Sequence, residues 1–140
     1  MSPETIAKVK ACRALRGKTV EMVCRMPEFI ANLDALIQVQ RKDRQAVRDS
    51  YEVLKKNPST KGFKLPAHAI DRLWNLDAEQ FSDEYLAVLD KSSSRSAAER
   101  KYIQQLAQQA YRYTVICFVV AEFPETRDEL LPRHEADNNQ

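Results

Sequence analysis

Between Pro27 and Pro58, positions at alternating steps of three and four residues form one stripe along the sequence. The stripe comprises Ile30, Leu33, Ile37, Gln40, Arg44, Val47, Tyr51 and Leu54. This heptad spacing places all eight side chains on one face of a helix, and no glycine or proline interrupts the segment. The stripe predicts one long packed helix over residues 27–56. Because residues 41–44 are all charged, two shorter helices that meet there are the alternative.

A second stripe with heptad steps lies in the C-terminal half of the chain. It comprises Ile103, Leu106, Ala110, Tyr113, Cys117 and Val120. Small and apolar neighbours widen this face, which is typical of a helix buried on more than one side. We therefore expect residues 103–120 to form the central helix. It should pack against the first stripe, so that two long antiparallel helices lie at the centre of the fold.

Glycine is scarce, which limits the folds open to this chain. Gly17 and Gly62 are the only glycines in 140 residues, whereas the tight hairpins and bulges of β-sheets need residues that adopt positive φ. Together with the two stripes, this scarcity predicts an all-α protein, a compact bundle of about five or six helices. Residues 20–26 and 113–120 are the segments that would form strands in the competing α+β fold.

Helix-start signals divide the chain further. The Ser-Pro-Glu sequence at residues 2–4 is typical of a helix N-terminus, and apolar positions continue from there to Val23, with Gly17 as a weak point. Further starts are predicted at Pro66, at Ser82, at Ser96 with Glu99 as a capping box, and at Thr126. We expect a single helical domain over residues 1–131 and a flexible tail over residues 132–140.

The cysteines and histidines form no metal-binding or catalytic pattern in the sequence. Cys12, Cys24 and Cys117 lack the C-x-x-C spacing, and their odd number suits neither a disulfide framework nor a zinc site. We expect reduced thiols on packed helix faces. His68 and His134 belong to no ligand-spaced group. The sequence therefore predicts no cofactor, no metal and no catalytic residue.

Two further sequence patterns bear on the cellular compartment and on nucleotide binding. Basic residues run through the first 20 positions, where a signal peptide would need an apolar core. The longest apolar run, residues 115–121, is far shorter than the ~18 residues of a membrane span. With unpaired cysteines, this favours a cytoplasmic protein. The sequence Gly17-Lys18-Thr19 matches the end of a phosphate-binding loop, but Cys12 stands where that motif needs a glycine. Nucleotide binding is therefore not predicted.

Charge is distributed unevenly along the chain. Residues 1–64 hold 14 basic and 7 acidic side chains, whereas residues 65–140 hold 8 and 13. The two halves face each other or are simply solvated, or the basic half binds an acidic partner or nucleic acid. The candidate basic surface comprises Lys8, Lys10, Arg13, Lys18 and Arg25. Because no aromatic side chain lies among these residues to stack on bases, a nucleic-acid-associated regulator is the alternative function.

Polar residues within the helical pattern mark a candidate partner interface. Gln40 and Arg44 stand where the heptad favours apolar side chains, and polar residues at such positions can set partner choice. A glutamine-rich flank beside the second stripe offers a neutral hydrogen-bonding surface. The candidate interface comprises Gln40, Arg44, Gln104, Gln105 and Gln108.

The preferred function is that of a small cytoplasmic protein-interaction module without catalysis. Adaptors, chaperones, immunity-type inhibitors and regulatory subunits fit this description, because helical bundles without a catalytic set more often bind than catalyse. The expected partner is another protein or a second copy of the chain, and no membrane is expected. An enzyme assembled from scattered residues is a third class, which a single sequence would conceal.

Overall fold

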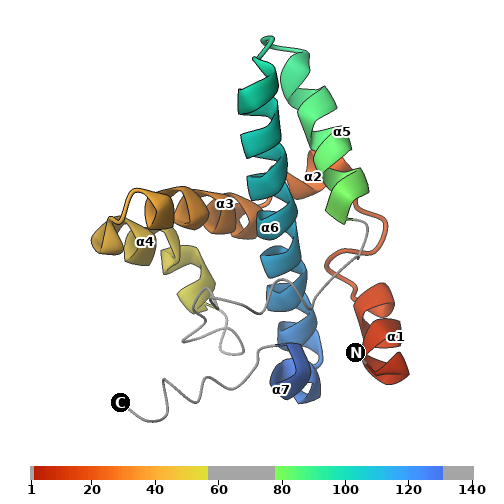
Figure 1. The fold of residues 1–140 in the computed structure, drawn as a ribbon. Coiled ribbons are helices and arrows are strands. Elements are labelled where there is room, and N and C mark those ends of the chain that lie inside the picture. Colours follow the sequence, from red (N-terminus) through yellow and green to blue (C-terminus); the bar gives the residue numbers. More distant parts are fainter. Residues whose placement is uncertain (1, 57–77, 131–140) are drawn as a thin grey trace.

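The computed structural model of the chain describes residues 2–56 and 78–130, and the regular secondary structure of this part is entirely helical (Figure 1). The α-helices are α1 (Pro3–Ala11), α2 (Val20–Val23), α3 (Pro27–Gln40), α4 (Arg44–Ser50), α5 (Ala78–Asp90), α6 (Ala97–Glu122) and α7 (Arg127–Leu130). Two 3-10 turns, η1 (Glu52–Lys56) and η3 (Pro124–Thr126), follow α4 and α6. The all-α prediction is confirmed. Both segments weighed as strands are helical over most of their length, in α2 and α6.

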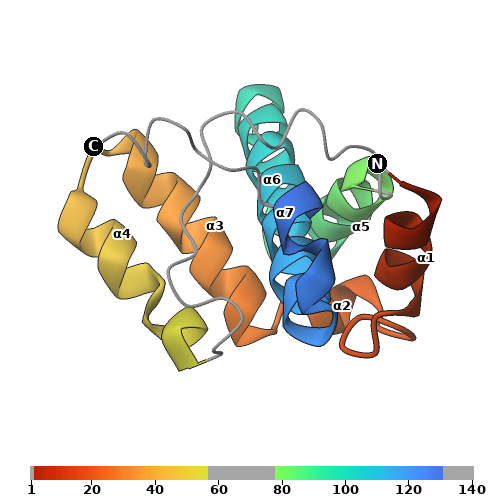
Figure 2. The same cartoon turned by 90° about the horizontal axis from the view of Figure 1, so that it is seen from below.

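The 26-residue helix α6 is the central element, as the second stripe predicted. Its antiparallel neighbour is α5, which runs beside it and is joined to it by a short connection over residues 91–96 (Figure 1). Helix α3 crosses α6 instead of running along it, while α4 lies outside α3 (Figures 1 and 2). The predicted pairing of two long helices is therefore replaced by an α5–α6 hairpin that α3 crosses.

The predicted single helix over residues 27–56 is wrong, and the two-helix alternative is confirmed. Helix α3 ends in a turn where Lys42 adopts a left-handed φ of 60°. The backbone N–H of Lys42 donates to the carbonyl of Val39 (3.0 Å), and that of Asp43 donates to the carbonyl of Gln38 (3.1 Å). This is a Schellman ending. The Asp43 side chain then accepts from the backbone N–H of Ala46 (3.0 Å) and caps α4.

The face of α3 that is buried differs from the predicted stripe. Phe29 is only 1 % exposed, whereas its neighbour Ile30, a stripe position, is 52 % exposed. The other buried residues of α3 are Ala31, Asn32, Ala35 and Leu36. Small and polar residues thus join Phe29 and Leu36 among the buried positions. Because α3 packs against α6 on one side and α4 on another, no single stripe describes its contacts. In α6 the predicted register holds, with all stripe residues from Leu106 onward buried.

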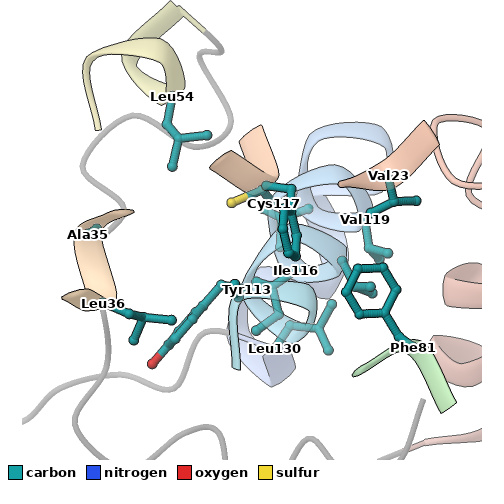
Figure 3. Packing of buried hydrophobic residues seen from close by; sticks show 14 of the residues in the cluster. Val23, Ala35, Leu36, Leu54, Phe81, Tyr113, Ile116, Cys117, Val119 and Leu130 are labelled. Atoms are coloured by element: carbon teal, nitrogen blue, oxygen red, sulfur yellow. The ribbon is translucent and has the colours of Figure 1, made fainter. Parts of the chain in front are cut away.

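The core forms around the C-terminal half of α6. Figure 3 shows Tyr113, Ile116 and Cys117 of α6 between Leu54 on one side and Phe81 on the other. A buried polar contact fixes the crossing of α3 and α6, because the Asn32 amide donates to the hydroxyl of Thr114 (3.3 Å) and to the carbonyl of Glu28 (2.9 Å). Burial of apolar side chains supplies most of the stabilisation of this core. The Asn32 hydrogen bond to Thr114 fixes how α3 and α6 align.

The N-terminal helix is shorter than predicted. Ser2 accepts from the backbone N–H of Thr5 (3.2 Å) and caps α1 as expected, but α1 ends at Ala11. Gly17 then adopts a φ of 77° in the connecting turn, a conformation that glycine adopts without steric cost. Thr19 caps the short α2 by accepting from Met22 N–H (3.2 Å). A helix through Val23 is therefore wrong, since the chain turns between two capped helices.

The C-terminal helix starts are partly as predicted. The Ser96–Glu99 capping box is present at the start of α6. Ser82, in contrast, lies inside α5, where its hydroxyl donates to the carbonyl of Glu79 (2.9 Å), so its predicted capping role is wrong. The predicted start at Pro66, both histidines, and the expected tail lie outside the described residues.

Candidate interaction surface

The turn between α3 and α4 carries two of the predicted interface residues on an exposed surface. We define the turn surface as Val39, Gln40, Arg41, Lys42, Arg44 and Tyr102, all of which are exposed. The hydroxyl of Tyr102 on α6 donates to the side-chain oxygen of Gln40 at the end of α3 (2.5 Å). This contact brings an aromatic residue of α6 to the turn, although the two residues are 62 positions apart in the sequence.

Two large apolar side chains are exposed at the turn surface. Val39 is 48 % exposed and Tyr102 is 41 % exposed, which places both among the four most exposed large apolar residues of the described chain. Single exposed apolar residues are ordinary on protein surfaces. Here the two are linked through Gln40, the neighbour of Val39 and the hydrogen-bond partner of Tyr102. Tyrosine in such a setting is among the residues that contribute most to protein interfaces.

The turn surface carries three cations that have no ion-pair partner in the described part of the chain. Arg41, Lys42 and Arg44 form no ion pair with any residue in the described ranges. The acid between these cations in the sequence is Asp43, and one of its carboxylate oxygens accepts the hydrogen bond that caps α4. The turn surface therefore combines a local excess of positive charge with exposed apolar area, a combination that attracts acidic partners.

Two of the three α6 glutamines in the predicted interface contact α5 and do not belong to the turn surface. Gln104 donates to the carboxylate of Asp83 (2.8 Å), and Gln108 donates to the hydroxyl of Ser82 (3.1 Å). Both contacts hold α6 against α5, so these two glutamines serve the helical hairpin. Gln105 is exposed. The structure thus brings Gln40 and Arg44 together at the turn and directs Gln104 and Gln108 toward α5.

The predicted basic surface is divided among three segments. Lys8 on α1 lies 3.5 Å from the carboxylate of Glu125, and Arg13 lies 3.6 Å from that of Glu122. These two cations are therefore paired with acids from the C-terminal half, as the uneven charge distribution suggested. The other members of the set, Lys10, Lys18 and Arg25, are exposed and have no ion-pair partner within the described residues.

Sequence reasoning missed Val39 and Tyr102 as surface residues. Both lie next to stripe positions, Gln40 and Ile103, and therefore off the face that the heptad pattern selects. A signal for the turn was present, because Asp43 directly before a run of helix formers is typical of an N-cap. Reading Asp43 as a cap would have divided the long helix at the correct place.

The thiols are unsuited to nucleophilic chemistry. All three cysteines are free, and burial raises the pKa of Cys117 to about 12 and also raises the pKa values of Cys12 and Cys24. A reactive cysteine needs the opposite shift, because the thiolate is the nucleophile. Within the described ranges, no group of three or more His, Cys, Asp or Glu side chains is placed to hold a metal ion.

Comparison with family models, curated proteins and solved structures found no match to this chain. In residues 2–56 and 78–130, no helix combines the length and the apolar character that crossing a membrane would require.

Proposed function

We propose that this chain is a small cytoplasmic protein-interaction module without catalysis, and that the turn surface is its main contact with a partner protein. The observation that carries the proposal is the coincidence, at one turn, of exposed Val39 and Tyr102 with three cations that form no ion pair within residues 2–56 and 78–130. Tyrosine and arginine are enriched in protein interfaces, and apolar anchors ringed by charge are the usual arrangement.

The partner that fits the turn surface is an acidic protein with an apolar residue at the centre of its contact area. Opposite charge would speed association and exclude basic competitors, while burial of Val39 and Tyr102 would slow dissociation. An adaptor, a chaperone, an immunity-type inhibitor or a regulatory subunit could each use such a contact. A second copy of the chain is one form of this partner, because residues 65–140 carry an excess of acids.

The competing function is nucleic-acid binding through the basic N-terminal half. The pairing of Lys8 with Glu125 and of Arg13 with Glu122 favours the protein partner, since two of the five candidate cations already have carboxylate neighbours. Phosphate-driven binding falls steeply with salt concentration. Titration of the chain with duplex DNA and RNA at two salt concentrations therefore separates the two functions.

The proposal is tested with charge reversals of equal size at two places. The test variant carries Arg41→Glu and Arg44→Glu, and the control carries Lys10→Glu and Arg16→Glu, four exposed residues in all. A partner identified by purification from the native host is then titrated with each variant. We expect the turn variant to lose at least tenfold in affinity and the control to stay within about threefold. Equal affinities of both variants for the partner would overturn the proposal.

A further inference from the structure

Three glutamates near the end of α6 contact α1 and the residues on either side of it. Glu122 is the last residue of α6, Glu125 lies in η3 and Glu129 lies in α7. Helix α1 packs against α6 in this region, as Figure 1 shows. The three side chains therefore hold the segment from Ser2 to Arg13 at three places along its length.

Glu129 contacts the first turn of α1. The hydroxyl of Thr5 and the backbone N–H of Ser2 each donate to its carboxylate at 2.5 Å, and the hydroxyl of Ser2 donates to it at 3.1 Å. Glu129 itself is exposed, so water competes for these hydrogen bonds.

Two ion pairs hold the rest of this segment. The Lys8 ammonium lies 3.5 Å from the Glu125 carboxylate. The backbone N–H of Arg13 donates to the Glu122 carboxylate (2.8 Å), and the Arg13 guanidinium lies 3.6 Å from it. The side chains of Glu125 and Arg13 are 55 % and 79 % exposed, and ion pairs with such exposure contribute little to stability.

The apolar contact of the segment is small. Val9 and Cys12 belong to the buried cluster that also contains Val119 and Val120 of α6. Thr5 is the other buried residue of the segment, whereas α6 has ten buried residues. Segments with few buried apolar side chains and exposed hydrogen bonds open at a lower free-energy cost than the core of the same protein.

We infer that residues 2–13 form a strap, which detaches from α6 as one unit while α3, α5 and α6 remain packed. Detachment breaks the contacts of the three glutamates and exposes Thr5, Val9 and Cys12. Because Cys12 is 0 % exposed while the strap is packed, the strap controls access to this thiol. None of these residues belongs to the turn surface, so the inference is separate from the proposed protein contact.

The rates at which iodoacetamide labels Cys12 and Cys117 in the native chain test the inference. Both residues are at most 2 % exposed, so the reagent reaches each thiol only after the structure around it opens. The label at each site is measured by mass spectrometry at pH 8, at reagent concentrations to which the rates are proportional. We expect Cys12 to be labelled at least about tenfold faster than Cys117. Similar rates at the two thiols would overturn the inference.

Urea distinguishes detachment of the strap from unfolding of the whole chain. The dependence of an opening reaction on urea grows with the surface that it exposes. The logarithm of the labelling rate should therefore rise with urea less than about half as steeply for Cys12 as for Cys117. Equal slopes would show that Cys12 is reached only through global unfolding, and the strap would be refuted.

A pair of matched variants tests the role of the glutamates. Glu125→Gln with Glu129→Gln removes two of the three carboxylates that hold the strap, and this variant should raise the Cys12 labelling rate at least about threefold. The control, Glu52→Gln with Asp90→Asn, removes two carboxylates from ion pairs with Lys55 and Arg100 and should change the rate less than about twofold. An equal effect of both variants on Cys12 would contradict the assigned role.

Discussion

Two neighbouring residues of α3, Phe29 and Ile30, allow a direct test of how this helix packs. Phe29 is 1 % exposed and its ring lies 5.3 Å from that of Phe81 and 5.7 Å from that of Tyr85. Replacing a buried phenylalanine with alanine costs about 3–5 kcal/mol, and the aromatic contacts place Phe29→Ala in the upper part of that range. We expect a loss of about 4 kcal/mol in the free energy of unfolding.

The neighbouring substitution, Ile30→Ala, should be mild. Full burial of such a side chain contributes roughly 1.5–3 kcal/mol. Because Ile30 is 52 % exposed, the substitution removes only about half of that contribution. The higher helix propensity of alanine offsets part of that loss. We expect about 0.5 kcal/mol, which leaves a difference of about 3.5 kcal/mol between the two variants, more than a hundredfold in the unfolding equilibrium. Urea unfolding followed by circular dichroism measures both values. A cost for Ile30→Ala equal to or above that of Phe29→Ala would refute the packing of α3 and favour the heptad register.

Three further predictions concern the turn, the thiols and the chain ends. Lys42→Gly should raise the free energy of unfolding by about 1 kcal/mol, because glycine adopts the left-handed φ of 60° without the steric cost that lysine carries; a decrease in urea midpoint would contradict this. In a thiol-labelling time course at pH 8, Cys24 should react before Cys117, whose pKa is raised to about 12 by burial, and rapid labelling of Cys117 in the folded protein would be the contrary result. Hydrogen bonds from Thr5 and Ser2 lower the pKa of Glu129. This contribution to stability is therefore present above the unfolded pKa of about 4.3 and is lost as pH falls through the lower folded value. The difference in urea midpoint between the native chain and Glu129→Gln should be larger at pH 7 than at pH 3, and a pH-independent difference would contradict the assignment.

The fold class and the central helix could be predicted from the sequence because both depend on strong local signals. The stripe from Leu106 to Val120 is buried as its periodicity predicts, and the Ser96 capping box is a short-range pattern that the structure reproduces. Such signals act within one or two helical turns. They therefore do not depend on how distant parts of the chain pack.

The arrangement of α3 could not be predicted in the same way, because it depends on partners distant in sequence. Periodicity selected Ile30 as buried, but Phe29 is buried instead and packs against two rings of α5, while Asn32 is buried against α6. A heptad pattern assumes one partner along one face, whereas α3 contacts α4, α5 and α6. The turn surface escaped prediction for a related reason, since Tyr102 reaches Gln40 only after α3 and α6 have packed.

The most direct test of the proposed function is photo-crosslinking from defined positions in the native host. A photoreactive residue is placed at position 39 in the turn surface. A control position is residue 10 on α1, which lies on the other side of α6 from α4 (Figures 1 and 2). We predict that one protein, either a distinct partner or a second copy of the chain, crosslinks from residue 39 and not from residue 10, and that Arg41→Glu with Arg44→Glu abolishes the product. Crosslinking of the partner from residue 10 alone, or crosslinking only to nucleic acid, would contradict the account.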